Sequence, residues 1–164
     1  MRPLYVAVVG PGDTATPPDE AAATLVGSAL ASGGAVLLTG GRGGVMAAAA
    51  KGCRAAGGVS IGILPDRDRQ LASPDSTFTI PTGMGELRNG LLVRAADAVV
   101  AVAPSWGTLS EVALAVRSGI PVVTVGDWGL PLPGPIGAPS PTDAASTALA
   151  LATGRRDQQP PGEP

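Results

Sequence analysis

Short apolar runs alternate with longer segments of helical length along the first 125 residues. The runs are rich in valine and isoleucine and cover residues 4–9, 35–39, 60–64, 78–80, 98–102 and 121–125. Several are apolar at consecutive positions, which is typical of strands covered on both faces. The alanine- or leucine-rich segments between them, residues 19–32, 45–56, 87–95 and 108–118, are predicted to be helices. This alternation predicts an α/β protein with a doubly wound, mainly parallel sheet, a Rossmann-like three-layer α/β/α fold.

The pattern changes after residue 125. Residues 126–141 contain five prolines and are predicted to be a loop. Residues 142–152 restore a helical pattern with Thr142 as its N-cap, and residues 153–164 are predicted to be a flexible tail. We therefore expect one domain over residues 1–152, as the total length of 164 residues also suggests.

Composition removes several classes of function. The chain has no histidine, which excludes Ser-His-Asp and Cys-His catalysis and every histidine metal site. Its single cysteine, Cys53, cannot form an internal disulfide, which favours a reducing compartment. The net charge of −2 and the absence of a basic run make nucleic acid an unfavourable partner. No apolar segment approaches the length of a membrane span. We expect a cytoplasmic protein.

Three glycine-bearing turns follow predicted strands. They are residues 10–12 (GPG), 40–44 (GGRGG) and 105–108 (SWGT), and two of them lead directly into a helix. Ligands of open parallel sheets bind beyond the carboxyl ends of the strands, where these turns lie. Glycine lets backbone N–H groups approach an anion, and a helix N-terminus adds partial positive charge. The turns therefore predict a phosphate site, although ordinary strand-to-helix turns also use glycine.

Two common phosphate-binding motifs do not account for these turns. A Walker A sequence is absent, because the only lysine, Lys51, lies inside a predicted helix. Residues 10–15 match G-x-G-x-x-A, but Pro17 and Pro18 delay the next helix and no acidic residue ends the second strand. A dinucleotide cofactor is disfavoured.

Three motifs resemble the lonely-guy (LOG)-related superfamily, whose members often carry the label "possible lysine decarboxylase". They are GGRGGVM at 40–46, GMGELRN at 83–89 and WGTLSE at 106–111. IPTGMG at 80–85 and GILP at 62–65 resemble a small bacterial branch of that superfamily. The similarity spans residues 4–126 in matching order.

The resemblance implies a nucleotide-binding homodimer or higher homo-oligomer that needs no metal or redox cofactor. Enzymes of the superfamily are phosphoribohydrolases that cleave the N-glycosidic bond of a nucleoside 5′-monophosphate, releasing base and ribose 5-phosphate. Their catalytic arginine and glutamate correspond to Arg88 and Glu111. The residues expected to bind the phosphorylated ligand are Gly10, Gly12, Gly40, Gly41, Arg42, Gly43, Gly44, Met46, Thr82, Asn89, Ser105, Trp106, Gly107 and Thr108.

The sequence departs from the enzymatic motif P-G-G-x-G-T-x-x-E at its start. Ala103, Pro104 and Ser105 replace the proline and two glycines, and Asn89 replaces the lysine that usually follows the arginine. Pro104 has no N–H, so the phosphate cradle loses one donor there, which the Ser105 hydroxyl could replace. This departure weakens the case for turnover.

The candidate residues also have ordinary structural interpretations. Thr108 and Glu111 have the spacing of a capping box. Arg88 lies in the first turn of a predicted helix, which is unfavourable for a cation and suggests an external anion, although Glu86 could neutralise it. Arg42 is interpreted equally as a phosphate ligand or a solvated side chain. Trp106 and Trp128 could stack on a base, cover the core or lie in an oligomer interface.

Two functions of different classes remain open from sequence. One is a nucleotide-binding phosphoribohydrolase; the alternative is a non-catalytic binding protein, either a molybdenum-cofactor carrier, which resembles this superfamily, or a nucleotide sensor. Resemblance to DNA-processing protein A suggests single-strand binding as a third, but that requires a basic groove, which an acidic chain disfavours.

Overall fold

Seven strands form one sheet in the computed structural model, which describes residues 2–158. All paired strands are parallel, and their order is β4-β3-β2-β1-β5-β6-β7. The strands are β1 (Tyr5–Val9), β2 (Val36–Thr39), β3 (Ser60–Leu64), β4 (Phe78–Pro81), β5 (Ala98–Ala101), β6 (Val122–Val125) and β7 (Ile136–Ala138). The order reverses between β1 and β5, which places the ligand-binding crevice of such a fold beside the loops that follow these strands.

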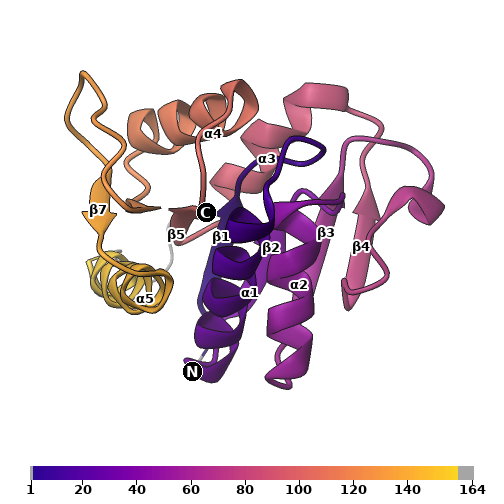
Figure 1. Ribbon diagram of the computed structural model, residues 1–164, viewed down its shortest axis with the longest axis horizontal. Helices are drawn as coiled ribbons and strands as arrows, with labels where there is room; N and C mark the ends of the chain where they lie inside the picture. Colours follow the sequence, from indigo (N-terminus) through magenta and orange to yellow (C-terminus); the bar gives the residue numbers. More distant parts are fainter. Residues whose placement is uncertain (1, 159–164) are drawn as a thin grey trace.

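Helices cover both faces of this sheet, as the sequence predicts. They are α1 (Pro17–Ser32), α2 (Val45–Ala55), α3 (Arg88–Arg94), α4 (Trp106–Arg117) and α5 (Pro141–Asp157), with short 3-10 helices η1 (Arg69–Leu71) and η2 (Gly85–Leu87). One apolar core joins the sheet to α1, α2 and α5, and a second joins it to α3 and α4. Figure 1 shows α1 and α2 in front of the strands, with α5 at the β7 end. The fold is a doubly wound, Rossmann-like α/β/α structure.

Local sequence explains where the first helix begins and how it packs. Thr16 caps α1 by accepting from the Asp19 amide, Asp19 accepts from the Thr16 amide, and Pro17 occupies the first position. Gly27 of α1 lies directly against the backbone of α2: a Cβ on it would be 2.0 Å from the Ala49 carbonyl oxygen. The absence of two side chains, at Gly27 and at Gly52, lets these helices cross with their backbones in contact.

The C-terminal part differs from the sequence prediction. The loop predicted for residues 126–141 contains β7, which pairs with β6 through Val123, Thr124 and Val125. Helix α5 begins at Pro141 with Ser140 as its N-cap, so the prediction of Thr142 as cap is wrong. This helix also continues to Asp157, five residues beyond the expected boundary at 152. Residues 159–164 of the predicted tail lie outside the described part.

The described residues contain neither a membrane-spanning helix nor a cluster of metal-ligating side chains. No helix there is long and apolar enough to cross a membrane. No group of three or more histidine, cysteine, aspartate or glutamate residues within 2–158 is placed to hold a metal ion.

Candidate functional site

The first two glycine turns are in direct contact. They follow neighbouring strands, β1 and β2, and the Val45 amide donates to the Pro11 carbonyl at 3.0 Å. Gly44 has φ +62°, and a Cβ on it would be 2.2 Å from the Gly12 carbonyl oxygen. A Cβ on Gly10 would be 2.6 Å from the Val45 side chain. Glycine is therefore required at both positions, because the two turns approach too closely for side chains.

The amides at the start of α2 lack partners. Gly41 donates to the Thr39 hydroxyl and Val45 to Pro11, but between them the amides of Arg42, Gly43 and Gly44 make no hydrogen bond to any described residue. Gly43 also has open space where a side chain would stand. Three consecutive amide donors without partners at a helix N-terminus are able to donate hydrogen bonds to an anion.

Arg88 lies against this turn from the start of α3. Its Nη1 donates to the carbonyls of Gly40 and Ile63, at 2.5 and 2.6 Å. A Cβ on Gly40 would be 2.6 Å from both Arg88 Nη1 and Met46 Sδ, so the three residues are packed together. The Arg88 Nε is buried without a partner, as is the Oδ1 of the neighbouring Asn89. The Nη1 atom of Arg88 is thus hydrogen-bonded within the protein, whereas its buried Nε has no hydrogen-bond partner.

Glu111 is the most buried charged residue of the site. It lies in the second turn of α4 with 8% of its surface exposed, and it accepts no hydrogen bond from any described residue. Burial raises the pKa of its carboxyl from 4.5 to about 7, against the opposing effect of the Arg88 charge. Burial lowers the pKa of Arg88, and Glu111 raises it, which shows that the two groups interact.

The capping box predicted for Thr108 and Glu111 is wrong. Ser105 is the N-cap of α4, because its hydroxyl accepts from the Thr108 amide at 3.1 Å and lies 2.8 Å from the Thr108 hydroxyl. The residue that replaces a motif glycine therefore caps the helix. Glu111 is then left without a capping role, while the amides of Trp106 and Gly107 have no partner among the described residues.

Arg42 and Thr82 have structural partners. Arg42 forms a two-pronged ion pair with Asp66, with Nε to Oδ2 at 2.9 Å and Nη2 to Oδ1 at 2.6 Å. The Thr82 hydroxyl donates to the Leu64 carbonyl and accepts from the Met84 amide. Asp66 was not among the predicted site residues, so this ion pair was missed. The position of Asp66 just after β3, at the ligand edge of a parallel sheet, is the signal that could have found it.

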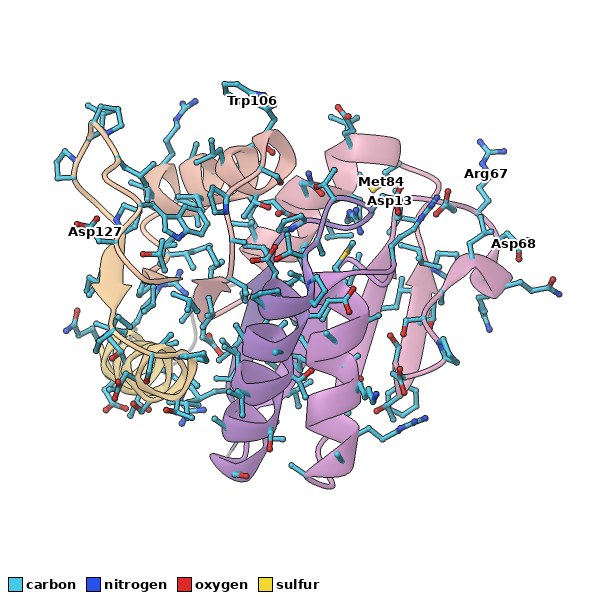
Figure 2. The ribbon with its side chains drawn as sticks, viewed as in Figure 1. Asp13, Arg67, Asp68, Met84, Trp106 and Asp127 are labelled. Carbon is cyan, nitrogen blue, oxygen red and sulfur yellow. The ribbon has the colours of Figure 1, made fainter. Side chains whose placement is uncertain are left out.

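The other predicted site residues lie at the same edge of the sheet with different exposure. Trp106 lies toward the upper edge in Figure 2, where its side chain extends from α4 into solvent; Asp13 and Met84, which were not predicted as site residues, lie toward the same edge. Trp106 is 90% exposed, whereas Trp128 is partly buried and donates to the Val125 carbonyl. The structure thus brings Gly10, Gly12, Gly40, Gly44, Met46 and Arg88 into one cluster and leaves the Trp106 indole outside it.

Comparison with known proteins identifies the class. The chain belongs to the SLOG cluster4 family, whose model matches residues 3–150; SLOG denotes proteins related to SMF/DprA and LOG. The predicted LOG-related membership is confirmed.

Individual relatives cover most of the chain. The molybdenum cofactor binding protein of Rippkaea orientalis is 38% identical, with a TM-score of 0.87 over 92% of this chain and 98% of that one. The Moco carrier protein of Chlamydomonas reinhardtii is 32% identical, with a TM-score of 0.84 over 93% and 99%. An uncharacterized protein of Archaeoglobus fulgidus is 38% identical over 73% of this chain and 78% of its own.

Proposed function

We propose that this protein binds a phosphorylated pterin cofactor of the molybdenum-cofactor type as cargo, without turnover. The observation that carries the proposal is the set of free amides of Arg42, Gly43 and Gly44 at the start of α2. A phosphate monoester would accept hydrogen bonds from these donors and gain from the positive end of the helix dipole. Similarity to two proteins named for binding or carrying this cofactor supports the choice of ligand.

The residues fit a cargo site better than a reaction site. Ser105 commits its hydroxyl to the α4 cap, and Pro104 supplies no N–H, so the turn after β5 has fewer donors for a second contact. Arg88 is fastened to two carbonyls and is expected to border the phosphate while Nη1 keeps these bonds. Arg42 would contact the phosphate only by sharing or leaving Asp66.

A phosphoribohydrolase is the second candidate, favoured by the state of Glu111. A buried carboxyl with a pKa of about 7 is poised to accept a proton near neutral pH. In that reaction Glu111 would take a proton from a water molecule while the oxygen of that water attacks the anomeric carbon. The C–N bond would break, its electron pair would go to the departing base, and the proton that Glu111 took from water would be passed on to that base. Arg88 would hold the 5′-phosphate beside it.

Binding of the cofactor tests the first function. Molybdenum cofactor released from a molybdenum enzyme is equilibrated anaerobically with the protein, and retained cofactor is measured by the fluorescence of its oxidised pterin. We expect the wild type to retain it. Gly43→Asp, which places a carboxylate in open space beside the free amides, should reduce retention at least about tenfold. Gly154→Asp, with the same charge change in α5, is the matched control.

Base release tests the second function. The protein is incubated with AMP, GMP, CMP and UMP, and free base is measured by chromatography. Base release that Glu111→Gln abolishes would establish the hydrolase and overturn a purely carrying role. Retained cofactor with no base release supports the carrier, and failure of both assays contradicts both functions.

A further inference from the structure

The Arg42 side chain joins the glycine turn at the start of α2 to the segment that follows β3. Its guanidinium donates from Nε and Nη2 to both carboxylate oxygens of Asp66, at 2.6–2.9 Å. Among the described residues, Arg42 alone donates to this carboxylate. The pair is open to solvent, since the Arg42 and Asp66 side chains are 45% and 23% exposed. An ion pair of this kind contributes little to stability, so a ligand can replace it at small cost.

The backbone on either side of this ion pair is held by other contacts. The Asp66 carbonyl accepts from the Gly83 amide at 2.9 Å, and the Gly41 carbonyl accepts from the Ser73 amide at 2.8 Å. We therefore expect both chain segments to keep their positions when the ion pair opens. Opening it requires only new side-chain torsions of Arg42, whose long side chain has many accessible rotamers.

The ion pair lies within electrostatic reach of the candidate site. The Arg42 amide is itself one of the three donors without a partner within residues 2–158. Burial lowers the pKa of Arg88 and Glu111 raises it; the Arg42 charge lowers this pKa further, and the Asp66 charge raises it. An anion bound at the free amides would thus be attracted by Arg42 and Arg88 and repelled by Asp66.

We propose that Asp66 limits the affinity of the site by competing with the ligand's phosphate for Arg42. The carboxylate holds the guanidinium when no ligand is bound. A bound phosphate accepts hydrogen bonds from the same N–H groups and leaves Asp66 without its partner. Binding therefore exchanges one ion pair for another, and the net gain is smaller than an unpaired arginine would give. A limited affinity suits a protein that must release its cargo.

The exchange rests on the proposed phosphate site at the start of α2, so its test must report on both. Two-dimensional NMR of isotope-labelled protein does so, with methyl phosphate, a small phosphate monoester, as the titrant. The backbone amide of Gly43 reports on the proposed site. The Nε–H of Arg42, assigned from its absence in Arg42→Lys, reports on the ion pair with Asp66. Slightly acidic pH keeps this proton in slow exchange with water.

We expect the Gly43 amide and the Arg42 Nε–H to shift with the same dissociation constant, because the phosphate binds the amides and takes the guanidinium together. A shift of Gly43 with an unchanged Arg42 Nε–H would overturn the exchange and leave the proposed site intact. An unchanged Gly43 amide would contradict the proposed site, and the exchange with it.

Removing the competing carboxylate tests its effect on affinity. Asp66→Asn should bind methyl phosphate about fivefold more tightly than wild type, because Arg42 is then available without breaking an ion pair. Asp68→Asn is the matched control: it removes the same charge from the same segment, and Asp68 contacts the Gln70 amide instead of Arg42. Its affinity should stay within about twofold of wild type. An Asp66→Asn affinity equal to that of wild type or of Asp68→Asn would overturn the proposal.

Discussion

Glu111 is the one charged residue among the described residues that is classed as buried. Its carboxyl is buried in the second turn of α4, and Arg88 is the charge that interacts with it. Because burial penalises the charged form more than Arg88 favours it, the folded protein holds the proton up to about pH 7. A neutral Glu111 also leaves the Arg88 charge without its buried carboxylate partner, which favours an anionic ligand.

Replacing this carboxyl should change how stability depends on pH. The unfolded chain ionises Glu111 near pH 4.5, and the folded chain near pH 7. The contribution of the protonated carboxyl is therefore complete below pH 4.5 and is lost as pH rises through 7. Glu111→Gln cannot ionise, so its free energy of unfolding relative to wild type should rise by about 3 kcal/mol between pH 4.5 and 8.

Urea unfolding at pH 4.5, 6 and 8 measures this effect. The exposed Glu20→Gln variant, which loses the same charge in α1, is the control. A constant difference between Glu111→Gln and wild type over this range would show that burial does not raise the pKa of Glu111.

At the level of elements, the crossing of α1 and α2 is the contact most sensitive to a single methyl group. Gly27→Ala places a Cβ 2.0 Å from the Ala49 carbonyl oxygen, so the helices must separate. We expect this change to reduce the free energy of unfolding by about 2 kcal/mol or more, as overpacking does. Gly154→Ala, in α5 with open space around it, should instead stabilise by about 0.5–1 kcal/mol. Chemical denaturation of both variants measures these changes. Equal effects of the two substitutions would contradict the close contact of α1 and α2 at Gly27.

Most elements could be predicted from sequence because their signals are local. The strand at residues 60–64 is found at its predicted bounds, and α2 ends within one residue of its prediction. Strand β7 could not be predicted: it has three residues among prolines and exists through its pairing with β6. The cap of α4 was assigned to Thr108 because its spacing to Glu111 is favourable, but Ser105 competes successfully for the same helix end.

In the candidate site, too, local features could be predicted from sequence, whereas contacts between residues distant in sequence could not. Glycine spacing located the turns at residues 10–12 and 40–44, because it reflects backbone conformation in each turn. The carbonyl partners of Arg88 are 48 and 25 residues away in sequence, and Asp66 is 24 residues from Arg42. The place of Asp66 just after β3 could have located it at this edge of the sheet, but no local pattern specifies which residues pair, and that required the folded chain.

For the whole molecule, the topology predicts an order of local stability. Strands β1 and β5 lie at the centre of the sheet, with the residues from Val6 to Val9 and from Ala98 to Ala101 almost fully buried. We expect their amides to exchange hydrogen only through global unfolding, while residues 126–135 exchange orders of magnitude faster. Hydrogen-exchange mass spectrometry measures both, and equal protection of the two regions would contradict this ordering.

The attachment of Arg88 to Gly40 and Ile63 has a consequence for any mutational study of this edge. The Arg88 guanidinium links the carboxyl ends of β2 and β3 to the beginning of α3. Truncating this side chain therefore removes structural hydrogen bonds as well as a positive charge. Loss of ligand retention in an Arg88→Ala protein would mix these two effects. Arg88→Lys keeps the charge but cannot reproduce the forked geometry of the guanidinium. Comparing the two variants therefore separates the effect of the positive charge from the effect of the lost hydrogen bonds to Gly40 and Ile63.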